Sequence, residues 1–242
     1  MVGTGASRIL IDTGEGELDW AMHIAGLLDG QTTTINDVLL THWHPDHIGG
    51  VPSLRQLCTT ARIHKHTPTG IQQEIEDGQR FSVQGATLRA VHCPGHTSDH
   101  MAFVLEEEDA MFTGDNVLGH GTAVFEDLGL YMESLERMKG EFGGRAYPGH
   151  GAVIEDGPAK VTEYVEHRRT REEQILGVLR AGDDGEVGLT GTGIVREVYK
   201  DVPEILHHPA LGGVLQVLGK LEGEGKVERF NGSWRATGKA SL

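Results

Sequence analysis

A short cluster of histidines and one aspartate constrains this chain more than any other part of its 242 residues. In the segment VLLTHWHPDHIGG, an apolar run typical of a buried strand leads directly into His42, His44, Asp46 and His47. Alternation along an extended chain places His42 and His44 on one side, and the turn at Pro45 directs Asp46 and His47 elsewhere. The segment therefore predicts ligands for two metal ions rather than one.

Three more candidate ligands follow predicted strands in glycine-rich settings. They are His96 in CPGHTSDH, Asp115 in FTGDNVLGHG and His150 in YPGHG. The glycines let the backbone turn sharply, so that the residue after each strand points over the edge of a sheet. Nitrogen and oxygen donors suit zinc or another borderline divalent ion, and the lack of thiolates argues against a closed structural zinc site.

The order of predicted elements indicates an α/β sandwich with mixed sheets. Up to about Gly157, short apolar strands alternate with helices, but residues 81–115 contain consecutive strands without helices. From Pro158 the pattern becomes helical, and the chain closes with two alternating runs around Asn231-Gly232, which is a strong hairpin signal. We therefore expect a catalytic domain at 1–157 and a winged-helix-like domain at 158–242.

Net charge, hydropathy and cysteine content indicate which partners and which cellular compartment to expect. The formal net charge is −15, and 23 of the 36 acidic residues, but only 9 of the 21 basic ones, precede Lys160, which disfavours nucleic acid as a partner. No apolar stretch is long enough to cross a bilayer, and no secretory signal is evident. The only cysteines, Cys58 and Cys93, form no CxxC motif, so we expect no disulfide framework and a cytoplasmic location.

Taken together, these motifs resemble the metallo-β-lactamase superfamily, whose fold is an αββα sandwich. The resemblance implies that His42, His44 and His96 hold one metal, that Asp46, His47 and His150 hold the other, and that Asp115 bridges both. It also implies two Zn²⁺ ions, with Mn²⁺ or Fe²⁺ as alternatives, and places Asp12 of IDTG behind the ligands as an orienting residue. Asp46 would also serve catalysis, by orienting the attacking water.

Two metals that activate a shared water imply hydrolysis of an ester, thioester, amide or phosphodiester. The stretch DNVLGHGTAVFEDL and the C-terminal region resemble the fungal atrochrysone carboxyl acyl-carrier-protein thioesterases, which release polyketides from non-reducing synthases. This resemblance implies an acyl carrier protein domain as the partner, a small-molecule acyl substrate and a role in secondary metabolism. Two alternatives remain: a single-stranded RNA endoribonuclease of the β-lactamase-like group, and an inactive homologue.

Further expectations concern histidines outside the ligand set and the start of the chain. His120 could line an acyl pocket, although an exposed loop histidine without a role is more common. His100 is expected either to support a ligand or to make a local capping contact, whereas His64 and His66, with no accompanying carboxylate or glycine turn, are expected at the surface. Because only eleven residues precede Asp12, the first hairpin of the fold is expected to be missing, which would leave a sheet edge exposed.

Overall fold

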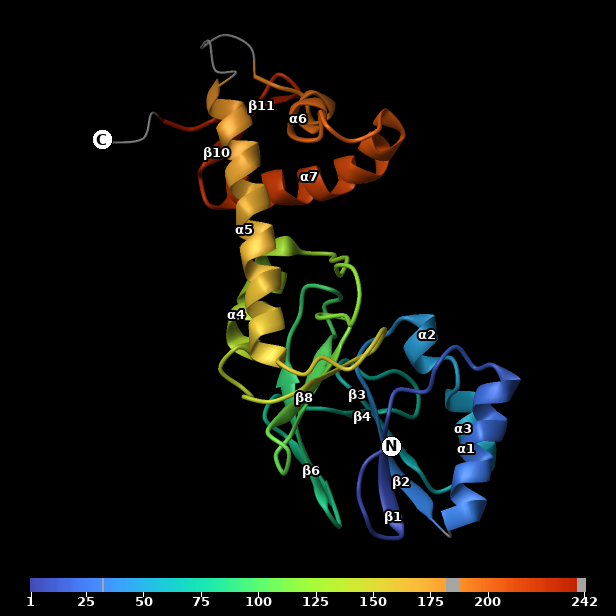
Figure 1. The fold of residues 1–242 in the computed structure, drawn as a ribbon. Coiled ribbons are helices and arrows are strands. Elements are labelled where there is room, and N and C mark those ends of the chain that lie inside the picture. The colour runs from blue at the N-terminus through green and yellow to red at the C-terminus, as the bar shows by residue number, and fades with distance from the viewer. Residues whose placement is uncertain (32, 182–187, 239–242) are drawn as a thin grey trace. The chain divides into compact units, whose positions relative to one another are not determined.

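The computed structural model describes residues 1–31, 33–181 and 188–238 and divides the chain into two compact units (Figure 1). The first unit covers Met1–Tyr164 and the second covers Val165–Leu242. The domain boundary predicted from the sequence, at 157/158, lies at the start of helix α5 (Gly157–Ala181). The division between the two compact units falls within this helix, so each unit contains part of it, and the domain bounds 1–157 and 158–242 stay a prediction.

The first sheet of unit 1 is parallel throughout. Its strands follow the order β1-β2-β3-β4, and β1 and β2 end at Ile11 and Leu40, directly before Asp12 and Thr41. Parallel strands end at the same edge, so the loops that follow β1 and β2 lie together. The elements of this half are β1 (Ser7–Ile11), α1 (Leu18–Gln31), β2 (Thr34–Leu40), α2 (Pro45–Ile48), α3 (Val51–Leu57), β3 (Arg62–Lys65) and β4 (Gln73–Glu74).

The second sheet has five strands in the order β5-β6-β7-β8-β9. Its pairs are antiparallel except for β8 and β9, which run parallel and end at Gly114 and Pro148. Asp115 and His150 follow these two strands and therefore lie near the same edge. The elements are β5 (Arg80–Val83), β6 (Ala86–His92), β7 (Met101–Leu105), β8 (Ala110–Gly114), α4 (Leu128–Met138) and β9 (Ala146–Pro148).

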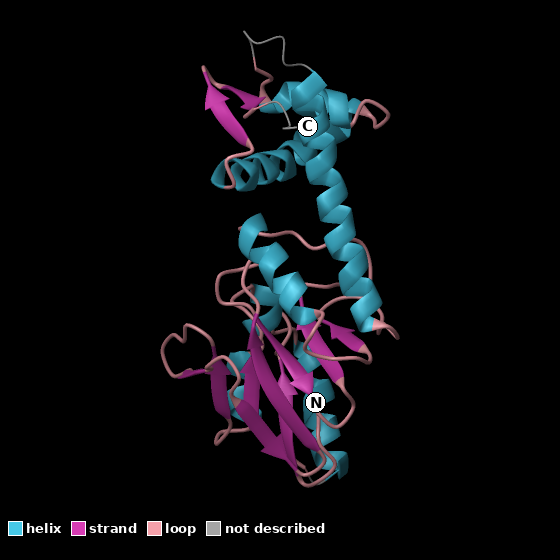
Figure 2. Ribbon diagram, turned by 90° about the vertical axis from the view of Figure 1, so that its left-hand side faces the viewer, coloured by secondary structure: helices cyan, strands magenta, loops and turns pink. Residues whose placement is uncertain are grey.

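Successive side chains along β1 and β2 point to opposite faces of the first sheet and enter different apolar layers. Ile9 and Leu39 pack with Leu88 and Phe103 of the second sheet, whereas the neighbouring Leu10 and Leu40 belong to a separate apolar cluster with helix residues. Two apolar layers thus lie on opposite faces of the first sheet. Helices α1 and α3 cover its outer face, and α4 lies on the side of the second sheet (Figures 1 and 2). This confirms the predicted αββα sandwich.

The start of the chain contacts the first strand. Val2 and Ile9 exchange two backbone hydrogen bonds of 2.8 and 3.2 Å in an antiparallel bridge, and the backbone N–H of Thr4 donates to the carbonyl of Gln84. The edge of β1 is therefore partly paired by the residues that precede it. Within the described part of the chain, no helix combines the length and the apolar character needed to span a membrane.

Unit 2 has the helix, helix and hairpin order of a winged helix. The hairpin turns at Asn231 and Gly232, whose φ angles of 49° and 79° are those of a type I′ turn. Leu189 pairs with Trp234 and adds a short third strand segment beside the hairpin. The remaining elements are α6 (Gly191–Val198), η1 (Glu204–Leu206), α7 (His207–Gly223), β10 (Val227–Phe230) and β11 (Ser233–Ala236).

Candidate metal centre

Loops at the ends of strands bring all seven predicted ligands together. His42 and His44 follow β2, Asp46 and His47 lie in α2, and Asp115 and His150 follow β8 and β9. The seventh ligand, His96, lies in the loop that joins β6 to β7. They form two groups, His42, His44, His96, Asp115 and Asp46, His47, Asp115, His150, in which the ligand atoms lie within 4.8 Å of one another.

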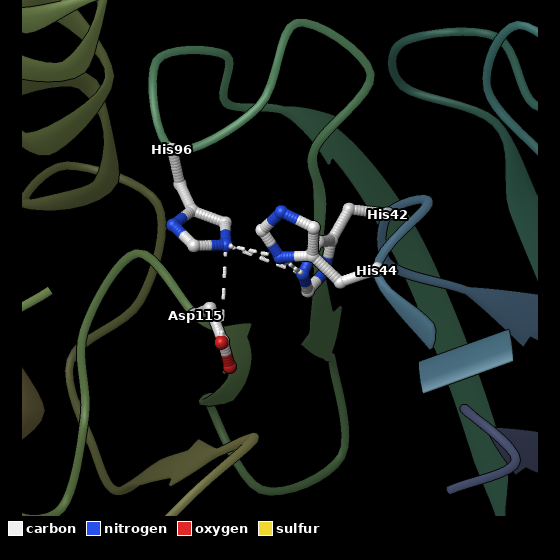
Figure 3. Close-up of side chains that lie close together, drawn as sticks. All are labelled: His42, His44, His96 and Asp115. Atoms are coloured by element: carbon white, nitrogen blue, oxygen red, sulfur yellow. Dashed lines mark hydrogen bonds and ion pairs between the residues drawn. The ribbon is translucent and has the colours of Figure 1, made fainter. Parts of the chain in front are cut away.

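Three imidazole nitrogens of the first group converge on one point (Figure 3). Nε2 of His96 lies 3.2 Å from Nε2 of His42 and 3.0 Å from Nδ1 of His44, and the last two are 2.9 Å apart. Oδ2 of Asp115 lies 3.8 Å from Nε2 of His96. Ligands of a tetrahedral zinc ion, each 2.0–2.1 Å from the metal, lie about 3.3 Å apart, so these spacings fit one ion.

The second group contacts both oxygens of the same aspartate. Nε2 of His47 is 3.4 Å from Oδ1 of Asp115 and 3.5 Å from Oδ2 of Asp46. Nε2 of His150 is 2.9 Å from Oδ2 of Asp46 and 3.5 Å from Oδ2 of Asp115. Asp115 therefore contacts both groups with its two carboxylate oxygens, which is the geometry of a bridging ligand.

Two buried polar atoms at this centre have no hydrogen-bond partner among the described residues. They are Nε2 of His47 and Oδ1 of Asp115, 3.4 Å apart and both directed into the second group. Buried polar atoms are ordinarily hydrogen-bonded, and a bound cation would satisfy both atoms. The donors are imidazoles and carboxylates without thiolates, a set that suits zinc, manganese or iron in a reactive centre. The residues present thus fit a pair of divalent cations.

Protonation of the histidines depends on their surroundings. Burial, reinforced by the neighbouring imidazoles, holds the pKa of His42 far below its ordinary value, and burial also lowers the pKa of His96. Burial acts in the same direction on His47, but the adjacent carboxylates of Asp115 and Asp12 outweigh it and raise the pKa of His47 to about 10. His42 and His96 therefore keep a free lone pair, whereas without metal His47 holds a proton between carboxylates.

Asp12 lies directly behind the ligands, as the resemblance implied. Its Oδ2 is 2.7 Å from Nδ1 of His47 and accepts a hydrogen bond from the hydroxyl of Thr41, while its Oδ1 accepts one from the backbone N–H of Thr41. The φ angle of Asp12 is 55°, in the left-handed region, which aspartate tolerates better than most residues. The backbone bend after β1 thus turns this carboxylate toward the end of β2.

Two further contacts orient ligand loops. Nδ1 of His96 is 2.8 Å from the carbonyl oxygen of Val124, which fixes a donor at this atom and leaves Nε2 for the first group. The backbone N–H of Asp115 donates to Nε2 of the fully buried His100 at 3.1 Å. Burial holds the pKa of His100 well below its usual value, so the ring is neutral and accepts this bond.

The loop that carries His96 packs closely on α4. A side chain at Gly95, whose φ is 126°, would place its Cβ 2.3 Å from the backbone of Tyr131, so only glycine fits there. The Tyr131 hydroxyl donates to the carbonyl of Asn116, and the Asn116 amide donates to the carbonyl of Cys93. These hydrogen bonds connect the segment before His96 with the residue after Asp115 and with helix α4.

The structure places the remaining candidates as follows. The His120 side chain is exposed, in a loop whose Gly119 N–H donates to the carbonyl of His150. The surface location expected for His64 is wrong, because His64 is 5% exposed and its Nε2 lies 2.8 Å from Oδ1 of Asp37. Thr41 and Val124 contact ligands of the centre but were not predicted from the sequence. Thr41 alone could have been inferred from the sequence, because it directly precedes the ligand His42.

Two family models match parts of this chain. Residues 1–150 match the model of the metallo-beta-lactamase superfamily, and residues 190–234 match that of the beta-lactamase associated winged helix domain. The chain is 48% identical over 239 residues to the lactamase-like protein nscB of Arthroderma gypseum, covering 94% of this chain and 76% of the relative. It is 46% identical over 241 residues to the atrochrysone carboxyl ACP thioesterase dmxR1 of Cryptosporiopsis, covering 94% of this chain and 74% of the relative.

Solved structures show the same fold at lower identity. A metallo-beta-lactamase family protein from Thermus thermophilus aligns over 98% of this chain and 92% of its own, with a TM-score of 0.74 and 22% identity. A beta-lactamase domain protein from Burkholderia ambifaria aligns over 95% of this chain and 82% of its own, with a TM-score of 0.78 and 20% identity. Both alignments extend beyond the first unit and include most of the second.

Proposed function

Since the chain belongs to the metallo-beta-lactamase superfamily, we propose that it is a dinuclear metal hydrolase that cleaves an acyl thioester of an acyl carrier protein. One observation carries the proposal: Asp115 lies between two four-residue ligand groups and belongs to both. The acyl group would be a polyketide in secondary metabolism, and the partner the carrier domain of a non-reducing polyketide synthase. We expect two Zn²⁺ ions, with Mn²⁺ or Fe²⁺ compatible with the same ligands.

Bound cations would supply a Lewis acid for the acyl carbonyl and lower the pKa of water to about 7. The protein supplies the metal ligands, and one of its carboxylates accepts a proton. Asp46 is the candidate catalytic carboxylate, because its side chain is 31% exposed whereas that of Asp115 is 12% exposed. The Asp46 carboxylate is therefore the more accessible of the two, and we propose that it orients an attacking water and accepts its proton.

The distribution of cations in unit 1 favours a thioester over a phosphodiester. Eight of its ten lysines and arginines form ion pairs with carboxylates: Arg62, Lys65, Arg80, Arg89, Arg137, Lys139, Arg145 and Lys160. Binding of a nucleic acid backbone requires cations that are free to contact phosphates. The two others, Arg8 and Arg55, lie in β1 and α3 rather than in a ligand loop.

The winged helix supports the same choice. A DNA- or RNA-reading helix normally presents several basic side chains. Lys220 is the only lysine or arginine in α7, and its ammonium group lies 2.9 Å from Glu172 and 2.7 Å from Glu224. With 14% of its side chain exposed, Lys220 is already neutralised within the unit. We therefore assign α7 no nucleic-acid-reading role.

An exposed aromatic side chain beside the ligands suits an apolar acyl group. Trp43 is 47% exposed, and its ring centroid lies 4.5 Å from that of His44. Val124, whose carbonyl faces His96, is 72% exposed. Both present apolar surface on loops that hold the centre, and such surface gains free energy when an apolar substrate covers it. The relative named as an ACP thioesterase, at 46% identity, is consistent with this substrate.

The test offers metal-loaded protein an acyl-carrier-protein thioester and a single-stranded RNA in parallel. We expect thioester release with intact RNA, and loss of release in Asp46→Ala. Asp19→Ala, which removes an exposed carboxylate from α1, is the matched control and should retain activity. RNA cleavage without thioester turnover would contradict the proposed substrate. Inactivity toward both, with two metals bound, would favour a non-catalytic homologue.

A further inference from the structure

A lysine is buried at the end of β3, in contact with the loop that carries His96. Lys65 is the last residue of β3 and is 5% exposed. Its ammonium group is in ion-pair contact with Oδ2 of Asp99, which is 4% exposed. A charged lysine is rarely buried unless it is paired, because desolvation costs more than most contacts return. The ion pair is therefore expected to have a role other than stabilising the fold.

The contacts of both groups are well defined. Besides its ion-pair contact with Asp99, the Lys65 ammonium donates to the carbonyl of His66 at 2.9 Å and to that of Thr67 at 3.2 Å. Oδ1 of Asp99 accepts a hydrogen bond from the buried Thr97 hydroxyl at 2.6 Å. The pair is thus held in a single arrangement at both ends.

The position of Asp99 connects the ion pair to the loop that carries the ligand His96. Asp99 lies three residues after His96, in the loop that joins β6 to β7 in the second sheet, whereas Lys65 belongs to the first sheet. The first ligand group spans the same two sheets, because His42 and His44 follow β2, the neighbour of β3. Figure 3 shows His96 approaching the other two rings from its own loop.

Most other anchors of this loop belong to its own half of the sandwich. Its first three residues are held by the Asn116 amide, the Ser134 hydroxyl and the backbone N–H of Glu126. None of these groups fixes the loop against the first sheet. Within the described part of the chain, the ion pair of Lys65 with Asp99 links this loop to β3, alongside the facing ligands and the backbone hydrogen bond from Met101 N–H to the carbonyl of Thr41 after β2.

We propose that Lys65 is a positioning residue for the metal centre, acting through Asp99 to hold His96 at the distance that His42 and His44 require. The inference rests on the metal centre of the proposed function but not on its substrate. Residues behind metal ligands typically change metal affinity about 10–100-fold when they are removed. Loss of the link should weaken the first ligand group and spare the second, whose residues Asp46, His47 and His150 do not contact it.

The test measures cobalt binding by absorption spectroscopy and calorimetry, together with urea unfolding of metal-free protein. Lys65→Met should lower affinity at one site about 10–100-fold, change the other less than about threefold, and lose the absorption component that is lost in His96→Ala. Arg62→Met is the matched control, since Arg62 pairs with Asp37 from the same strand but its side chain is 60% exposed. It should bind both ions normally.

A double variant separates positioning from bulk stability. Lys65→Met with Asp99→Leu leaves no unpaired buried charge, so resistance to urea should recover, whereas cobalt affinity at the first site should stay low. Recovery of both, or normal binding in Lys65→Met, would overturn the inference. Equal weakening of both sites would do the same. A wild-type protein that binds no metal would overturn the centre as well, whereas failure of thioester turnover alone would affect only the proposed substrate.

Discussion

Oδ2 of Asp12 lies 2.7 Å from Nδ1 of His47, on the side of the ring opposite the nitrogen that faces Asp46 and Asp115. A carboxylate in this position fixes which nitrogen carries the proton and increases the basicity of the other one. We predict that Asp12→Asn, which keeps the size but removes the charge, weakens metal binding by the second ligand group about 10–100-fold. Calorimetric titration with zinc would measure it.

Asp19→Asn is the control for that experiment, because Asp19 is an exposed carboxylate of α1 outside both ligand groups. Its zinc titration should match that of the wild type. Equal zinc affinity in Asp12→Asn and Asp19→Asn would show that Asp12 does not act on the ligands. The Asp12 carboxylate would then serve only the bend at the end of β1.

Trp43 provides a test of the acyl substrate. If its exposed ring binds the acyl chain, Trp43→Ala should raise KM for an apolar acyl thioester about tenfold, equivalent to about 1.4 kcal/mol. The kcat value should change less, because Trp43 is not a ligand. Leu206→Ala, which removes an exposed apolar residue of unit 2, is the control. A KM that is the same for short and long acyl chains in wild type and variant would exclude this role.

The ligands could be predicted from sequence because each follows a strand and lies in a local pattern of turn-forming residues. His42 and His44 alternate after an apolar run, and His96, Asp115 and His150 each follow a glycine. These signals are contained within a few residues. The same is true of the hairpin at Asn231-Gly232, where both residues adopt positive φ as the type I′ turn requires.

Contacts between segments that are far apart in the sequence leave no comparable local pattern in it. His64 was expected at the surface, since alternation cannot show that Asp37, 27 positions earlier, lies beside it in the paired strand β2. The link from Lys65 to Asp99 has the same origin, because it depends on how two sheets pack. Strand β4 has only two residues, Gln73 and Glu74, and both are exposed, so no hydrophobic period marks it.

Metal removal should lower the thermal stability of unit 1. Zinc at a free concentration 100 times its dissociation constant stabilises a folded protein by about 2.7 kcal/mol, which corresponds to a Tm shift on the order of 5–10 °C. We expect a chelator to reverse a shift of this size, as followed by calorimetry. Asp115→Ala should show a much smaller response, because both ligand groups lose a member. An unchanged Tm on chelation would contradict the metal centre.

Cys93 should resist modification in the folded protein. Its side chain is fully buried, and burial raises the pKa of its thiol to about 12, so the reactive thiolate is scarce at pH 8. Iodoacetamide at pH 8 should leave Cys93 unmodified in native protein and alkylate it after denaturation, as peptide mass spectrometry would show. Rapid alkylation in native protein would indicate that the loop before His96 opens, contrary to its packing against α4.

Asp37 should contribute to stability in a pH-dependent way. Although burial alone would raise it, hydrogen bonds from His64 and Arg62 hold the pKa of the Asp37 carboxyl below its ordinary value of 3.8. A carboxyl whose folded pKa is depressed stabilises the protein above the unfolded pKa, and this contribution is lost as the pH falls through the folded value. The contribution should be complete above about pH 5 and decrease below about pH 4.

Asp37→Asn should therefore lower the free energy of unfolding by about 2 kcal/mol near pH 7, since it removes a charged acceptor from a buried contact. The difference from the wild type should shrink below about pH 4, because the unfolded wild-type carboxyl then binds a proton that the folded carboxyl, with its lower pKa, does not. Urea unfolding between pH 3 and 7 measures this difference, with Asp29→Asn on the exposed end of α1 as control. A difference that stays constant down to pH 3 would show that the Asp37 charge does not contribute, and that Asp37→Asn acts through packing alone.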